Sequence, residues 1–241
     1  MFAAAALLAI GVPANAEPTI VGGQLADTAW SWMASLHTDD GENYCGGSLI
    51  KPTWVLTAAH CIGSHTAGGQ VRLGSLNRTG GGTLATVKSA VVHPKYDAKT
   101  LHNDIALVQL TAPVKNTPVV LATGTSWTNY TLRLFGWGQT CPQRDCDNGS
   151  DKLKRLDVKV LPEAGCRGVA ITKYDEATEL CVSSTSTATA CFGDSGGPAV
   201  YMANDRLVGV TSRGSGPCGQ DADTIYTRVQ PYLDWITRTT A

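Results

Sequence analysis

The sequence has little charge and no excess of either sign. Only 16% of its residues are charged, and 19 Lys and Arg against 20 Asp and Glu leave a formal net charge of −1. Proteins that bind nucleic acid or acidic membranes usually present a basic surface, so neither partner is expected. The chain also lacks the CxxC and HExxH patterns and a carboxylate-rich calcium loop. We therefore expect neither a metal ion nor a cofactor.

No apolar run is long enough to cross a membrane, which takes about 20 residues. The longest run lies at the N-terminus and ends in Ala14-Asn15-Ala16, a small-x-small cleavage pattern. This pattern is typical of a secretory signal peptide, which we assign to residues 1–16. A disordered apolar tail is the alternative. Export would place the protein outside the cell and leave residues 17–19 as a short propeptide before Ile20.

The eight cysteines fit this expectation of export. Disulfides persist in oxidising compartments, so we expect the cysteines to be paired with one another. Their spacing alone does not decide which pairs form.

Short β-prone segments, separated by Gly, Asn, Asp and Pro, recur along the 241 residues. This pattern predicts an all-β barrel or sandwich in place of βαβ units. Apolar residues at helical spacing occur near the C-terminus, at Val229, Leu233 and Ile236, and predict a helix over residues 229–238.

Three separated segments carry residues suited to hydrolysis. Residues 193–198 (GDSGGP) surround Ser195 with glycines, which allow a sharp turn and bring N–H groups close to a bound carbonyl. Residues 56–61 place His60 after an apolar strand, and residues 103–107 place Asp104 before one. A nucleophile, a base and a group that orients the base are what peptide hydrolysis needs at neutral pH. Taken singly, His60 and Asp104 also have ordinary structural explanations, whereas a Gly-Ser turn does not explain the whole of residues 193–198.

The pattern Gly193-x-Ser195-x-Gly197 also fits the nucleophile elbow of α/β-hydrolases. That fold requires its catalytic histidine after the serine. All five histidines of this chain precede Ser195. A lipase or esterase of this class is therefore excluded.

Taken together, the three segments resemble the trypsin and chymotrypsin family, in which TAAHC, DIAL and GDSGGP carry the catalytic histidine, aspartate and serine. The similarity extends over residues 20–241, from Ile20-Val21-Gly22-Gly23 to the terminal helix. It implies two six-stranded antiparallel β-barrels, over about residues 20–118 and 119–228, with the active site between them. The short propeptide suggests a bacterial member of the family.

The resemblance implies a serine endopeptidase that acts on peptide or protein substrates. Ser195 would attack the substrate, His60 would be general base and acid, and Asp104 would orient His60. The N–H groups of Gly193 and Ser195 would form the oxyanion hole, and Ser212 would lie beside the aspartate. We expect a monomer, with protein protease inhibitors as further partners. A binding protein without catalysis is the alternative, which the intact triad disfavours.

The resemblance also implies an activation step and three disulfides. Cleavage before Ile20 would release an ammonium group that enters a pocket and pairs with Asp194, because a buried charge is costly without a partner. The implied disulfides leave two cysteines as a local pair, so the four expected pairs are Cys45–Cys61, Cys141–Cys146, Cys166–Cys181 and Cys191–Cys218.

The residues expected in the specificity pocket are not those of a trypsin. Thr189 occupies the base, where trypsin-like members have Asp, so a basic substrate residue lacks its counter-ion. Gly214 leaves one wall open, and Thr224 narrows the other. We predict a small-to-medium aliphatic preference at P1, the residue before the cleaved bond. Arg213 replaces a common Trp, and two interpretations remain: a surface arginine packed on the cleft wall, or a cation that attracts an acidic substrate group.

Overall fold

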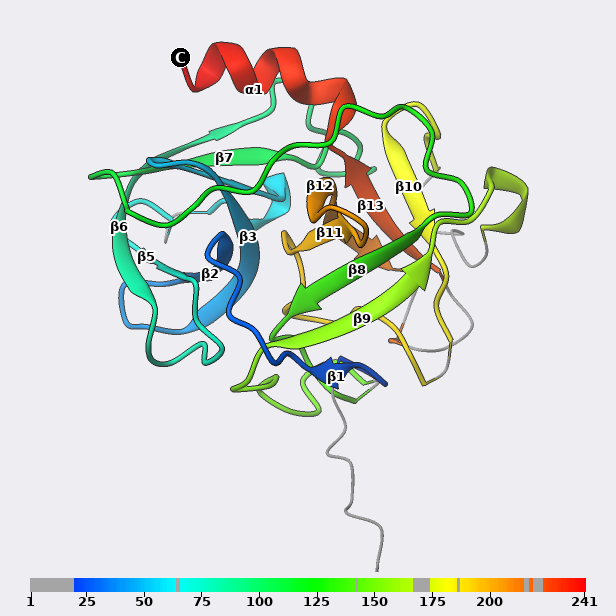
Figure 1. The fold of residues 1–241 in the computed structure, drawn as a ribbon, viewed down its shortest axis with the longest axis horizontal. Helices are drawn as coiled ribbons and strands as arrows, with labels where there is room; N and C mark the ends of the chain where they lie inside the picture. The colour runs from blue at the N-terminus through cyan, green and yellow to red at the C-terminus, as the bar shows by residue number, and fades with distance from the viewer. Residues whose placement is uncertain are drawn as a thin grey trace, which may run out of the picture.

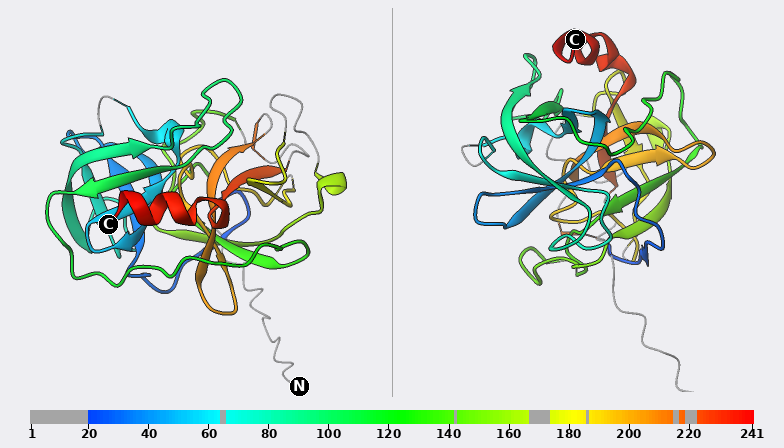
Figure 2. Two further views of the ribbon diagram at one scale, coloured as in Figure 1. Left: turned by 90° about the horizontal axis from the view of Figure 1, so that it is seen from above. Right: turned by 60° about the vertical axis from the view of Figure 1, so that its left-hand side comes forward.

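The computed structural model describes residues 20–63, 66–141, 143–166, 174–185, 187–214, 217–218 and 223–241. Its strands form two antiparallel sheets, one in each half of the chain, and the segment between β7 and β8 runs from the first half to the second (Figures 1 and 2). Within these ranges, no helix is long and apolar enough to cross a membrane. The predicted signal peptide and propeptide lie outside the described residues.

The first half is a closed six-stranded barrel. Strand pairing follows the order β2-β3-β4-β7-β6-β5. The strands are β2 (Met33–His37), β3 (Asn43–Lys51), β4 (Trp54–Thr57), β5 (Gln70–Leu73), β6 (Thr83–Val92) and β7 (Ala106–Leu110). Strands β2 and β4 are buried along their whole length, as expected of apolar segments that close a core.

The second half is a seven-stranded sheet in the order β1-β9-β8-β11-β12-β13-β10. Its strands are β1 (Gln24–Leu25), β8 (Thr131–Gly136), β9 (Lys154–Lys159), β10 (Glu179–Val182), β11 (Pro198–Tyr201), β12 (Arg206–Gly214) and β13 (Thr224–Arg228). A bridge between Val160 and Val182 joins the end of β9 to β10, so the six longer strands curl toward closure. The fold agrees with the expected chymotrypsin-like double barrel.

The two halves share a continuous core. The ring of Phe135 in β8 contacts Trp30, with ring centroids 4.4 Å apart, and Trp32, with centroids 5.8 Å apart. These aromatic side chains fill the boundary between the halves, where burial of large rings contributes most per residue. The segments predicted to be catalytic therefore come from two sheets that pack on each other directly.

The chain ends in a helix, as predicted. A 3-10 turn, η3 (Gln230–Tyr232), leads into α1 (Leu233–Thr239), which lies beside the first barrel near β7 (Figure 1). The His93 ring packs edge-on against both Tyr232 and Trp235, each at 4.9 Å between centroids. These two aromatic side chains thus anchor the end of the chain to the first half.

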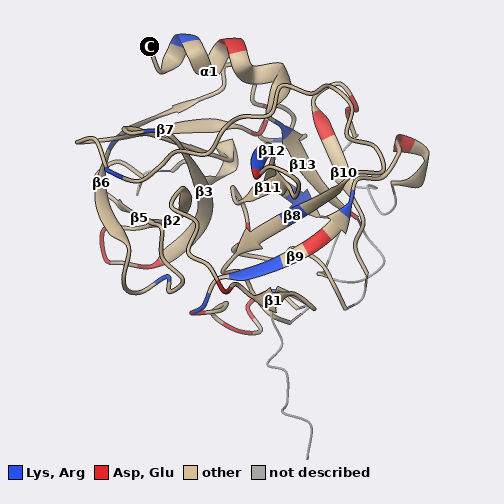
Figure 3. Ribbon diagram, viewed as in Figure 1, with Lys and Arg blue, Asp and Glu red and all other residues tan. Residues whose placement is uncertain are grey.

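Charged residues are spread over the surface. In the view of Figure 3, basic and acidic residues both lie along β9 and do not gather into a patch of one sign. This distribution accords with the net charge of −1.

Candidate active site

His60 is held by one carboxylate at both its backbone and its ring. The residue lies in the 3-10 turn η1 (Ala59–Cys61), directly after β4. Its ring Nδ1 is 2.7 Å from Asp104 Oδ2, and its backbone N–H donates to Asp104 Oδ1 at 2.9 Å. Because Nδ1 is used in this pair, Nε2 is the ring nitrogen left to accept a proton from a nucleophile.

Asp104 is fully buried, and the second half of the molecule fixes it in place. Ser212 Oγ donates to Asp104 Oδ2 at 2.7 Å, and Thr227 Oγ1 donates to its backbone carbonyl at 2.9 Å. The preceding Asn103 has φ of 53°, in the left-handed region that Asn tolerates better than most residues. The carboxylate is therefore oriented toward His60 before a substrate binds.

The loop that carries Ser195 packs directly against the first barrel. The Gly46 N–H donates to Ser195 O at 2.7 Å. Gly196 has φ of 75°, and a Cβ at this position would overlap Thr57 Oγ1, so the close approach requires glycine. Ser195 and His60 line the same cavity of about 290 Å³. The structure thus brings Ser195 and the His60–Asp104 pair together between the two halves.

Two backbone N–H groups beside the nucleophile, those of Gly193 and Ser195, have no hydrogen-bond acceptor among the described residues. Neighbouring groups are paired: the Asp194 N–H donates to Cys191 O at 3.0 Å and the Gly196 N–H to Thr211 O at 2.9 Å. Gly193 has φ of 93°, a conformation that favours glycine. Two unpaired N–H groups on either side of Asp194 can together bind an oxyanion.

Asp194, between these two residues, points away from the cavity into the protein. Its Oδ1 accepts from the Gly138 N–H and its Oδ2 from the Cys191 N–H, both at 2.8 Å. A Cβ at Gly136 or Gly138 would overlap the carboxylate, so glycines make its space. Burial raises the pKa of Asp194 to about 6, and the bonds from Cys191 and Gly138 oppose this rise.

The segment that begins at Ile20 packs against the loop that precedes Ser195. Ile20 is fully buried, and Val21 O accepts a hydrogen bond from the Thr189 N–H at 2.9 Å. In the continuous chain Ile20 N belongs to a peptide bond. The ammonium predicted to pair with Asp194 therefore exists only after cleavage.

The cavity beside Ser195 contains the predicted pocket residues. Its lining includes Thr189, Ser212, Arg213, Gly214 and Thr224. No carboxylate lines the part of this cavity that the structure describes. A Cβ at Gly214 would meet nothing within 4 Å, so this wall is open as predicted.

Two residues behind this cavity were not predicted. Ser184 Oγ lies 3.0 Å from Thr189 Oγ1 and 3.1 Å from Thr224 Oγ1, and the Ser184 N–H donates to the buried Asp223 at 3.1 Å. Neither Ser184 nor Asp223 belongs to a motif. Pairing of β10 with β13, in which Val182 faces Thr224, brings their segments together.

Arg213 differs from both interpretations of its sequence. Its Nη1 and Nη2 donate to Glu179 Oε1 and Oε2, each at 2.8 Å. The Arg213 side chain is only 7% exposed and that of Glu179 only 1%. The prediction of a surface arginine is therefore wrong, and the idea of a cation for acidic substrates loses its basis because Glu179 balances the charge. A glutamate within the apolar strand segment 179–182 is the sequence signal that points to a buried partner.

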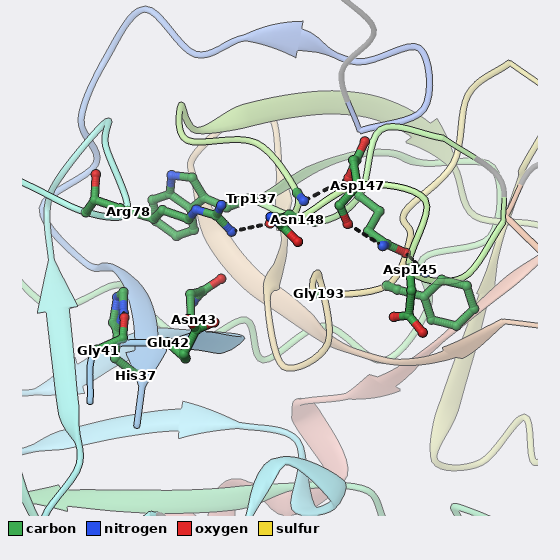
Figure 4. A pocket seen from close by; sticks show the side chains of 15 residues that line it. His37, Gly41, Glu42, Asn43, Arg78, Trp137, Asp145, Asp147, Asn148 and Gly193 are labelled. Carbon is green, nitrogen blue, oxygen red and sulfur yellow. Dashed lines mark hydrogen bonds between the residues drawn. The ribbon is translucent and has the colours of Figure 1, made fainter. Parts of the chain in front are cut away.

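A second cavity, of about 460 Å³, lies on the other side of Gly193 (Figure 4). Its walls come from the loop after β2, the β8–β9 connection and Arg78. The Arg78 guanidinium donates to Asn148 O at 2.5 Å and thereby fixes one wall. Phe192 and Gly193 border this cavity, and Phe192 also lines the first. A bound chain therefore has room on both sides of the nucleophile.

All eight cysteines are paired. The pairs are the four expected from the resemblance: Cys45–Cys61, Cys141–Cys146, Cys166–Cys181 and Cys191–Cys218. The first holds the turn that carries His60 against β3, and the last joins the loop before Ser195 to the opposite wall of the cavity.

Comparison with known proteins decides the family. The family model described as Trypsin matches residues 20–236. The chain belongs to the trypsin family. Within this family it is 37% identical over 229 residues to brachyurin of Leptuca pugilator, covering 90% of this chain and 96% of the relative. It is 36% identical over 234 residues to a trypsin of Squalus acanthias, covering 93% and 97%.

A solved structure of the trypsin family shows the same arrangement. Mouse neuropsin, a serine protease expressed in the limbic system of the brain, matches with a TM-score of 0.81 and 31% identity, over 91% of this chain and 99% of that one. Membership of the family makes the protein a serine endopeptidase that hydrolyses peptide bonds. These relatives are animal proteins, so the expected bacterial origin has no support.

Proposed function

We propose that the protein is a secreted endopeptidase in which Ser195, His60 and Asp104 cleave peptide bonds through an acyl-enzyme. The observation that carries the proposal is the occurrence of three features around Ser195. They are the 2.7 Å pair between His60 and the buried Asp104, the presence of Ser195 in the same cavity, and the unpaired N–H groups of Gly193 and Ser195.

The reaction follows from these groups. Ser195 Oγ attacks the substrate carbonyl while its proton passes to His60 Nε2, and Asp104 stabilises the resulting imidazolium. The Gly193 and Ser195 N–H groups bind the oxyanion, where loss of one donor typically costs ~10²–10³ in rate. Collapse expels the amine, which takes the proton from His60. Water then attacks the ester, with His60 again as base, and releases the second product.

The role of Ser195 can be tested by replacement. Folded Ser195→Ala and His60→Ala variants should each lose ~10⁴–10⁶ in turnover of a peptide substrate, because the triad acts as a unit. Circular dichroism would verify that the fold is retained. Full peptidase activity in folded Ser195→Ala would contradict the proposal.

The pocket supports a non-tryptic, small-to-medium aliphatic preference at P1. Thr189 and the β-branched Thr224, which the resemblance assigns to the base and one wall, both line the cavity, and no carboxylate lines the described part. Amide substrates with Ala, Val, Thr or Leu at P1 should therefore be cleaved faster than those with Arg or Lys. A peptide-library cleavage profile checks this preference, and strong cleavage after Arg would contradict it.

The proposed function also includes secretion, an activation step and a monomeric state. Four disulfides accord with an oxidising compartment. We propose export through the signal peptide 1–16, activation by removal of residues 17–19, and action as a monomer on which protein protease inhibitors can act. Intact-mass measurement of the secreted protein would give its N-terminus, and gel filtration its oligomeric state.

A further inference from the structure

Two threonines that line the cavity beside Ser195 form a triangle of hydroxyl groups with a buried serine, at the predicted base of the pocket. Thr189 Oγ1, Ser184 Oγ and Thr224 Oγ1 are separated by 3.0, 3.1 and 3.3 Å, and all three residues are buried. Thr189 and Thr224 line the cavity, whereas Ser184 lies behind them. A triangle of this kind is polar but carries no charge of its own.

The protons of this triangle are already committed within the protein. Each hydroxyl has one proton to donate and two lone pairs that accept. Thr189 Oγ1 has its own acceptor in Ala190 O, at 3.0 Å. Ser184 and Thr224 then supply the two protons for hydrogen bonds inside the triangle. The hydroxyl oxygens therefore present unused lone pairs to the cavity. A ligand can accept a hydrogen bond from one of these hydroxyl groups only if a hydrogen bond within the protein breaks.

Asp223 contacts the backbone of Ser184 and supplies a further hydrogen-bond acceptor. The residue is fully buried, and its Oδ1 accepts the N–H of Ser184, the residue that links the two threonines. An acceptor-only carboxylate at this place disfavours further acceptors at the base. Asp223 is not among the described residues that line the cavity.

From this arrangement we infer that the pocket selects, among medium-sized P1 residues, side chains that end in a neutral hydrogen-bond donor. The carboxamide of Gln or Asn meets this requirement, whereas Met and Leu have similar size without a donor. Thr189 and Thr224 are then specificity-determining residues that contact the substrate, and Ser184 is a positioning residue. The inference rests on the proposed function of the site and revises its P1 preference: small aliphatic residues are accepted, but a medium-sized residue with a terminal donor is preferred to an aliphatic residue of similar size.

Matched peptides test the inference. Substrates that differ only in Gln or Met at P1, and a second pair with Asn or Leu, are compared by kcat/KM. We expect the donor member of each pair to be cleaved about fivefold faster, the effect of about one net hydrogen bond. Equal rates, faster cleavage of Met and Leu, or faster cleavage after Lys than after Gln would overturn the inference.

Binding separates this inference from the catalytic proposal. The Ser195→Ala protein is titrated with the N-acylated product peptides that end in Gln or Met, by calorimetry. Tighter binding of the Gln peptide supports the inference even if the wild type cleaves nothing, a result that would contradict only the proposed catalysis. Equal binding in a wild type that cleaves both peptides would overturn the inference alone.

Substitutions at Thr189 test whether its hydroxyl group causes the preference for Gln over Met. Thr189→Val keeps the side-chain shape but removes the hydroxyl, so the Gln-over-Met ratio should fall to about one, whereas Thr189→Ser should retain the ratio. Thr185→Val is the matched control, because Thr185 is an exposed threonine of the same loop whose hydroxyl bonds only locally to Thr187. An unchanged ratio in folded Thr189→Val would overturn the assignment of the triangle.

Discussion

Among single residues, Asp194 is the proposed partner of the Ile20 ammonium and lies in the loop that carries Ser195. Its carboxylate is buried with two backbone donors, and burial raises its pKa to about 6. In the unfolded chain the same group would have a pKa near 3.9. A raised pKa means that the folded protein binds the proton more tightly than the unfolded one.

The raised pKa of Asp194 makes the stability of the uncleaved protein fall as the pH rises. Stability from protonated Asp194 is fully present below about pH 4 and is lost as the pH rises through about 6, a fall of up to about 3 kcal/mol in the free energy of unfolding. After cleavage, the Ile20 ammonium would favour the ionised carboxylate and remove this loss. Urea unfolding between pH 4 and 7 should therefore show a fall in the uncleaved Ser195→Ala chain that the chain beginning at Ile20 lacks.

Two comparisons test whether Asp194 causes this pH dependence. Asp194→Asn in the uncleaved chain should abolish the fall, because the amide does not titrate. If the free energy of unfolding fell equally with pH in the cleaved and uncleaved proteins, the proposed pair between Asp194 and the Ile20 ammonium would be contradicted.

The three residues of the proposed triad could be selected from the sequence because each lies in a contiguous motif. His60, Asp104 and Ser195 each have neighbours whose small or apolar character serves the same site, so the local sequence carries the signal. The environment of Arg213 could not be predicted in this way, since its partner Glu179 is 34 residues away in the chain. A solvated arginine and a buried one have the same local sequence.

Between elements, the Arg213–Glu179 pair joins β12 to β10, although β13 lies between them in the sheet. The Asp175 N–H also donates to Glu179 Oε2, at 2.9 Å, which ties the turn before β10 to the same pair. Glu179→Gln should lower the free energy of unfolding by about 3–5 kcal/mol, because it leaves the buried Arg213 without its counter-charge. Urea unfolding measures this loss.

The chain offers a matched control on the surface. Arg133 and Asp157 form a similar two-bond pair between β8 and β9, at 2.7 and 2.9 Å, but Asp157 is 42% exposed. Asp157→Asn should cost about 0–1 kcal/mol. The double variant Arg213→Leu with Glu179→Leu should recover most of the loss of Glu179→Gln, since apolar replacement of a buried pair is often neutral. Similar losses at Glu179 and Asp157 would contradict the importance of burial.

Strand pairing explains why sequence patterns did not predict the hydroxyl triangle at the specificity pocket. The β-prone segments and their turns predict an all-β chain, and the family resemblance supplies the two-barrel arrangement. The hydroxyl triangle arises only once Val182 pairs with Thr224, because this register brings Ser184 to Thr189 and Thr224. Side chains that meet through register leave no pattern in the linear sequence.

For the molecule as a whole, the short propeptide has a consequence for activation. If signal cleavage follows Ala16 as proposed, it would leave Glu17-Pro18-Thr19, and the activating cut would then follow Thr19. Thr19 is small and carries a hydroxyl donor, and Pro18 favours an extended backbone before it. These features match the proposed pocket, and we expect the active enzyme to process its own zymogen in trans.

Incubation of Ser195→Ala zymogen with a trace of active enzyme tests this expectation. N-terminal sequencing should give Ile20-Val21-Gly22-Gly23. A Thr19→Val zymogen, which keeps the shape but loses the hydroxyl, should be processed several-fold more slowly. A persistent Glu17 terminus would refute self-processing and leave another protease as the activator.

The central claim is that Ser195 is a nucleophile activated by His60. Its most direct test is covalent labelling of the active enzyme with an organophosphate, followed by mass spectrometry of the digested protein. The wild type should carry one adduct, on Ser195, and folded His60→Ala and Ser195→Ala should remain unlabelled under the same conditions. An adduct on another serine, or an unlabelled wild type that still cleaves peptides, would contradict the account.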